Sequence, residues 1–75
     1  MDHLKIEPNF AIPGEHTFRS YAAGDAFYEA LIEAHRGLTP EQSRLVNARL
    51  VLLLANHIGD VRVLREALAA ARDGV

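Results

Sequence analysis

The chain has 75 residues, with 8 Lys and Arg against 10 Asp and Glu for a formal net charge of −2, and it contains no cysteine. This length fits one domain with a marginal core, and the charge balance offers no field that would attract nucleic acid or anionic lipid. Without cysteine there is no disulfide or Cys-based zinc site to stabilise a small fold, so helix packing or self-association must do so.

Targeting and membrane segments are not predicted. The first residues lack the basic and apolar regions of a signal peptide. The apolar run Leu50–Ala55 is far shorter than the roughly 20 residues that a membrane span needs. We therefore expect a cytoplasmic protein that does not enter a membrane.

Residues 1–23 are predicted to form an extended N-terminal arm, because apolar and polar side chains alternate there with a period of two. Pro8 excludes a central strand but allows an edge strand or a polyproline-like stretch. Pro13 and Gly14 suit the central positions of a type II turn. The apolar anchors of the arm are Leu4, Ile6, Phe10 and Ile12.

Residues 24–75 are predicted to form a three-helix domain. The first helix begins at Asp25, a good N-cap, and Gly37 ends it as a C′ glycine. Its apolar stripe consists of Phe27, Tyr28, Leu31, Ile32 and His35. The third helix begins at the N-cap Asp60 and is closed by Gly74. Its apolar face consists of Val61, Leu64, Ala67, Leu68 and Ala71.

The second helix is predicted from Pro40 to Ile58, with Thr39 and Gln42 as the two members of a capping box. This helix is apolar almost all the way round, whereas a surface helix usually buries a stripe little more than about 100° wide. Two helices of the same short chain cannot cover it completely. The sequence thus predicts an all-α fold, a helical hairpin plus a third helix with an extended N-terminal arm, that forms a homodimer or binds a larger protein.

Eight residues are candidates for that interface. Asn47 falls inside the apolar arc of the second helix, where it either bonds to a nearby backbone or fixes the register of pairing with a partner. The arm has too many apolar side chains to remain a solvent-exposed tail, so we expect them to be covered in the assembled state. The candidate interface residues are Asn47, Val51, Leu54 and Ile58 of the second helix and Leu4, Ile6, Phe10 and Ile12 of the arm.

No constellation of catalytic, cofactor-binding or metal-binding residues is recognisable, so we predict a non-enzymatic protein with no cofactor and no metal. His35 and His57 are interpreted as caps of helix C-termini, where an imidazole meets the negative end of the dipole. The first alternative is a small-ligand or metal-binding protein that uses His35, His57 and Asp60.

The second alternative is a divergent DNA-binding regulator. Ala55 and Gly59 match the Ala-x-x-x-Gly of a helix-turn-helix, but Arg65 stands where that motif needs an apolar side chain. We therefore expect no nucleic-acid partner.

The segments Asp25–Thr39, Glu41–Ser43, Leu50–Asp60 and Leu64–Leu68 resemble a small proteobacterial helical family catalogued as domain of unknown function 2783. The stretch Leu-Ala-Asn-His-Ile-Gly-Asp that ends at Asp60 is the most specific part of this resemblance. The resemblance covers about Ala23 to Arg72 and leaves the arm before Tyr21 outside. It implies a helical fold without an assigned activity, and an accessory role beside flavin-dependent oxidoreductases of aromatic-compound breakdown.

Overall fold

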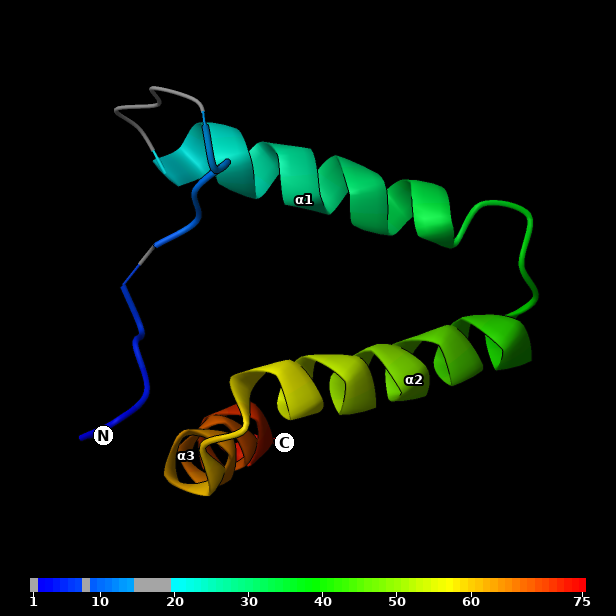
Figure 1. Ribbon diagram of the computed structural model, residues 1–75. Helices are drawn as coiled ribbons and strands as arrows, with labels where there is room; N and C mark the ends of the chain where they lie inside the picture. The colour runs from blue at the N-terminus through cyan, green and yellow to red at the C-terminus, as the bar shows by residue number, and fades with distance from the viewer. Residues whose placement is uncertain (1, 8, 15–19) are drawn as a thin grey trace. The chain divides into compact units, whose positions relative to one another are not determined.

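The computed structural model describes residues 2–7, 9–14 and 20–75, with the backbone alone for residues 20–22. Over these residues the chain forms the helices α1 (Ser20–Ala34), α2 (Pro40–Ile58) and α3 (Val61–Arg72), and no β-strand (Figure 1). The predicted all-α, three-helix fold is therefore confirmed. No helix among the described residues is long and apolar enough to cross a membrane.

The chain divides into two compact units. One unit joins Met1–Leu4 to Arg44–Val75 and holds most of α2 and all of α3. The other unit is Lys5–Ser43, with the greater part of the arm, α1 and the first turn of α2. The arm is thus shared between the two units, since its first residues belong with the C-terminal half of the chain.

In the Lys5–Ser43 unit, α1 begins at Ser20, so the prediction that it begins at Asp25 was wrong. Asp25 suggested the start because aspartate is a good N-cap residue, yet the helix continues back through Gly24, and a single glycine in a helix costs only about 1 kcal/mol. Packing outweighs that cost here. A Cβ built on Gly24 would lie 3.6 Å from Cδ2 of Phe10, and the neighbouring Ala23 is only 5% exposed.

The end of α1 is a short, tightened turn. The N–H of His35 donates to the carbonyl of Ile32 at 3.1 Å, and that of Arg36 to the carbonyl of Glu33 at 3.2 Å. Such i to i−3 bonds are common where an α-helix ends. Gly37 follows with φ +75°, a left-handed conformation that glycine adopts without strain, but α1 ends at Ala34, so Gly37 lies one residue beyond the predicted C′ position.

The start of α2 carries the predicted capping box. The N–H of Gln42 donates to Oγ1 of Thr39 at 3.2 Å, and the N–H of Thr39 donates to Oε1 of Gln42 at 2.9 Å. Two backbone donors at the helix start are satisfied in this way. Both predicted ends of α2, Pro40 and Ile58, agree with the structure.

The described part of the arm, residues 2–7 and 9–14, has no regular secondary structure. Pro13 and Gly14 form a turn, and the φ of +87° at Gly14 is the value that a type II turn requires at its third position. Phe10 stacks on Phe27 of α1, with ring centroids 5.9 Å apart and an interplanar angle of 24°. This contact fixes the arm to α1 within the Lys5–Ser43 unit.

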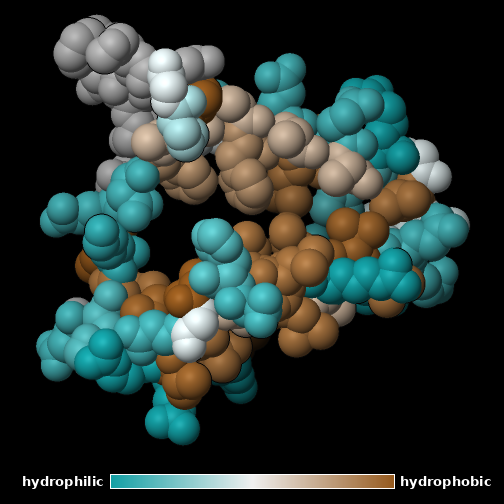
Figure 2. All heavy atoms as spheres, viewed as in Figure 1, coloured by the Kyte–Doolittle hydropathy of each residue, from teal (hydrophilic) through white to brown (hydrophobic). Residues whose placement is uncertain are grey.

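The core is very small. Ala23 is the one buried hydrophobic residue among the side chains that the structure describes, and neither α2 nor α3 contains a buried residue. Figure 2 shows hydrophobic side chains at the surface along α2. The apolar surface that was expected to need a partner is therefore present and uncovered.

Candidate functional site

The most prominent surface of the Arg44–Val75 part of the chain is apolar. Val51 is 59% exposed, Leu54 47% and Ile58 50%. Other large apolar side chains of this unit are also exposed, namely Leu45, Leu52, Leu53, Val61 and Leu68. Isolated exposed leucines need no explanation, but a large group of apolar side chains on one element is typical of an interaction surface.

Three of the exposed side chains, Val51, Leu54 and Ile58, follow Asn47 at spacings of four, three and four residues. At about 100° per residue these positions fall within about 60° of one another on the helix. Asn47 is itself exposed, so it is a candidate surface residue and not a buried amide. We call Asn47, Val51, Leu54 and Ile58 the α2 stripe.

The candidate residues of the arm have different surroundings. Leu4 and Ile12 are half-buried, whereas Ile6 is largely exposed. Phe10 is half-exposed and packs on α1 through Phe27 and the backbone beside Gly24. Leu4 belongs to the unit that contains α3, while the other three belong to the unit that contains α1. Leu4 is therefore described with α3, and Ile6, Phe10 and Ile12 with α1.

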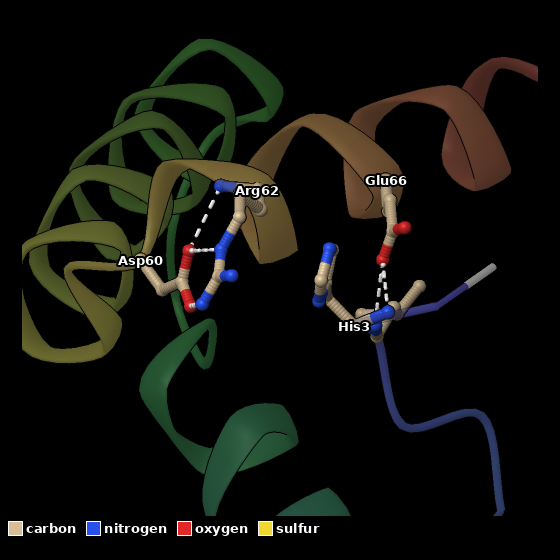
Figure 3. A network of polar contacts seen from close by, with 5 residues as sticks. His3, Asp60, Arg62 and Glu66 are labelled. Atoms are coloured by element: carbon tan, nitrogen blue, oxygen red, sulfur yellow. Dashed lines mark hydrogen bonds and ion pairs between the residues drawn. The ribbon is translucent and has the colours of Figure 1, made fainter.

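A polar cluster on α3 holds the first residues of the chain. The carboxylate of Glu66 accepts three consecutive backbone N–H groups, from Asp2 at 3.0 Å, His3 at 2.9 Å and Leu4 at 2.7 Å. Figure 3 shows Glu66 of α3 pointing toward the backbone at His3. Hydrogen bonds to a charged acceptor are shorter and stronger than those between neutral groups. The cluster thus ties the start of the arm to the middle of α3, more than sixty positions along the chain.

The same contacts act on the pKa of Glu66. Partial desolvation raises the pKa of this carboxyl. The hydrogen bonds from the N–H groups of Leu4, His3 and Asp2, together with the charge of His3, lower the pKa by more than desolvation raises it, so the net shift is downward. Glu66 is therefore held as a carboxylate, the form that accepts these hydrogen bonds best.

Asp60 and Arg62 form the start of α3 (Figure 3). Oδ1 of Asp60 accepts the backbone N–H of Arg62 at 3.0 Å, which confirms Asp60 as the N-cap. The guanidinium of Arg62 also donates to both carboxylate oxygens, at 3.1 and 2.8 Å. The side-chain hydrogen bond from Arg62 is the largest influence on the Asp60 carboxyl and lowers its pKa to about 2.

The helix-end histidines differ in their contacts. Nδ1–H of His35 donates to the carbonyl of Leu31 at 2.8 Å, one of the last carbonyls of α1, so the predicted capping role of His35 is confirmed. His57 lies exposed in the last turn of α2. Over the residues that the structure describes, no group of three or more His, Asp and Glu side chains is arranged to hold a metal ion.

Two features of this surface were not found from the sequence. The contact of Glu66 with residues 2–4 uses backbone N–H groups, which every residue except proline carries. No pattern of side chains in the sequence therefore predicts this contact. Phe10 stacks on Phe27, and both residues were expected to be covered. The alternation of apolar residues within the arm does not predict which residue either ring contacts.

These features define a small all-helical protein with a tethered arm and an apolar helix whose side chains are exposed. The chain belongs to the family described as protein of unknown function DUF2783, whose model matches residues 4–73. The match begins at residue 4, so the expectation that the arm lies outside the family was wrong. No curated protein and no solved structure is detectably similar to the chain.

Proposed function

We propose that this chain is a small non-enzymatic accessory protein whose function is to bind other proteins through the exposed apolar surface of α2. The observation that carries the proposal is that no residue of the described helix α2 is buried, although the middle of the helix is dominated by leucine, valine and alanine. Burial of apolar surface is the main favourable term in most protein association, at roughly 25 cal/mol per Å².

The partner is either a second copy of the chain or a larger protein. The sequence resemblance makes a flavin-dependent oxidoreductase the first larger partner to test, and the proposal keeps the cytoplasmic location expected from the sequence. The tethered arm supports the same function, because residues 2–4 are fixed on α3 in the same unit as the α2 surface.

The test is affinity purification of the tagged chain from its native host at native expression. We expect one protein to co-purify at fixed stoichiometry, or the tagged chain to capture its untagged copy, and Leu54→Glu to abolish the capture. Asn56→Glu is the matched control, because it places the same charge on the same helix at an exposed polar position about 160° away from Leu54. A chain that captures neither itself nor another protein would contradict the proposal.

The same preparation tests the alternatives. Stoichiometric zinc or iron in elemental analysis, removed by a chelator, would favour the metal-binding alternative with His35, His57 and Asp60. A salt-dependent shift of a labelled DNA duplex would favour the DNA-binding alternative. We expect neither result.

A further inference from the structure

A second exposed stripe lies on α3. Val61, Arg65, Leu68 and Arg72 follow one another at spacings of four, three and four residues. At about 100° per residue these positions fall within about 60° of one another on the helix. Val61 is 53% exposed and Leu68 65%, and both arginines are exposed as well. We call these four residues the α3 stripe; it alternates aliphatic side chains with guanidinium groups over about 16 Å.

The acidic side chains of α3 and of its N-cap are used inside the chain. Asp60 pairs with Arg62 at 2.8 Å, and Glu66 accepts the N–H groups of residues 2–4. Glu66 lies at least about 100° around the helix from every member of the α3 stripe. The contact that holds the arm therefore leaves the stripe exposed.

The guanidinium groups of the α3 stripe are available for carboxylates. Within the part of the chain that the structure describes, no ion pair or hydrogen bond involves the side chain of Arg65. The side chain of Arg72 donates to the backbone oxygen of Val75. Asp73 follows Arg72 and lies about 100° away around the helix. Arginine binds carboxylates through two parallel hydrogen bonds and is enriched in protein interfaces, so this stripe has the composition of a docking surface.

We infer that the α3 stripe binds an acidic amphipathic helix of another protein. The stripe needs a partner that presents carboxylates and aliphatic side chains alternately over about three helical turns. A helix that repeats glutamate or aspartate and leucine at spacings of three and four residues presents them in this way. This surface lies on α3 and goes beyond the proposed function, which depends on α2.

A nucleic acid fits the α3 stripe less well. Duplex DNA carries one negative charge per about 1.7 Å of its axis, whereas the two arginines of the stripe lie about 10 Å apart along α3. Val61 and Leu68 gain nothing from a phosphate backbone, and the chain has a formal net charge of −2. Sparse carboxylates between aliphatic side chains match the stripe in both respects.

The first test uses three labelled helical peptides of about 18 residues as probes. They share leucines along one face and differ only at two positions beside these leucines, which hold glutamate, glutamine or lysine. We expect the glutamate peptide to bind the full chain with a dissociation constant on the order of 100 μM, the glutamine peptide about tenfold more weakly, and the lysine peptide not at all. Fluorescence anisotropy is the measurement.

The second test changes the protein. Arg65→Glu should weaken binding of the glutamate peptide by about tenfold or more and should create binding of the lysine peptide, a gain that a misfolded variant would not show. Leu68→Ala should weaken the glutamate peptide by about fivefold. Arg44→Glu is the matched control and should change nothing, because Arg44 lies about 21 Å along α2 from Ile58. Far-UV circular dichroism checks that each variant is folded.

The outcomes separate this inference from the proposed function. Equal binding of the glutamate and glutamine peptides, or no binding of either, overturns it. A labelled DNA duplex that binds more tightly than the glutamate peptide, and is lost in Arg65→Glu, overturns it in favour of nucleic acid. Peptide binding that Leu54→Glu abolishes and Arg65→Glu leaves intact assigns the contact to α2, which supports the proposed function and overturns the role of α3.

Discussion

The carboxylate of Glu66 accepts the backbone N–H of Leu4 at 2.7 Å, so a side chain in the middle of α3 holds the start of the arm. The same carboxylate accepts the N–H groups of Asp2 and His3. One glutamate thus determines where the first residues of the chain lie on this unit.

The first prediction is that Glu66→Ala releases residues 2–4 without melting α3. Backbone N–H groups that lose their acceptor exchange with solvent faster, and we expect amide exchange at His3 and Leu4 to accelerate by about tenfold or more. Hydrogen exchange measured residue by residue by NMR gives the answer. Glu66→Gln should show a smaller effect, because the amide keeps one oxygen but loses the charge. Glu29→Ala, at an exposed position of α1, is the control.

Unchanged exchange at His3 and Leu4 in Glu66→Ala would show that other contacts hold the arm. Helix loss in the same variant, detected by circular dichroism, would show instead that Glu66 is needed for α3 itself. Neither is expected, since Glu66 is not an N-cap and its bonds lead away from its own helix.

The second prediction concerns stability in acid. The folded-state pKa of Asp60 is lowered to about 2 from an ordinary value of 3.8, first by its side-chain hydrogen bond with Arg62. A group with a depressed folded pKa stabilises the fold fully above its unfolded pKa and loses that contribution as the pH falls through the folded pKa. The thermal midpoint should therefore fall as the pH is lowered from about 4 to 2.

Asp60→Asn isolates this effect. Asparagine keeps the N-cap acceptor for the N–H of Arg62 but has no charge to titrate, so this variant should be less stable at neutral pH and less sensitive to acid. Glu66, whose pKa is also lowered, contributes with the same sign and remains in the variant. Melting curves of both proteins at several pH values are the measurement. Parallel pH profiles of the two proteins would refute the assignment to Asp60.

The third prediction tests the capping box at the start of α2. Thr39→Ala removes Oγ1, the acceptor for the N–H of Gln42, and should lower the free energy of unfolding by about 1 kcal/mol. Thr39→Ser restores a hydroxyl at the same place and should recover most of the loss. Urea denaturation followed by circular dichroism measures both. Equal stability of the alanine and serine variants would mean that the cap contributes little.

Local signals predicted α2 and α3 closely, because their ends depend on short-range hydrogen bonds. Thr39 bonds to a residue three positions away, and Asp60 to one two positions away, so the sequence around each cap contains the whole arrangement. The start of α1 was missed for the opposite reason. Its first turn holds Ala23, the buried residue, beside the glycine on which Phe10 packs, and such packing depends on a distant segment.

The same distinction holds for the candidate site. The α2 stripe follows from helical periodicity, and the structure shows its four members exposed, whereas their role in an interface stays a prediction. The contact of Glu66 with residues 2–4 could not be predicted, since its donors are backbone groups far away along the chain. Periodicity identifies which face of a helix lacks cover, but it does not identify what reaches that face.

The last prediction concerns the contact of Phe10 with Phe27. Phe10→Ala should lower the stability of the Lys5–Ser43 unit by about 2 kcal/mol, because it removes a half-buried aromatic ring and its stacking on Phe27. Ile6→Ala is the matched control on the same arm: Ile6 is largely exposed, so its truncation should change the free energy of unfolding by less than about 0.5 kcal/mol. Urea denaturation followed by circular dichroism and by the near-UV signal of the aromatic rings gives both values. Equal losses in the two variants would show that the arm is held without a specific contribution from Phe10. A large loss for Phe10→Ala alone would show that this ring forms part of the small core beside Ala23.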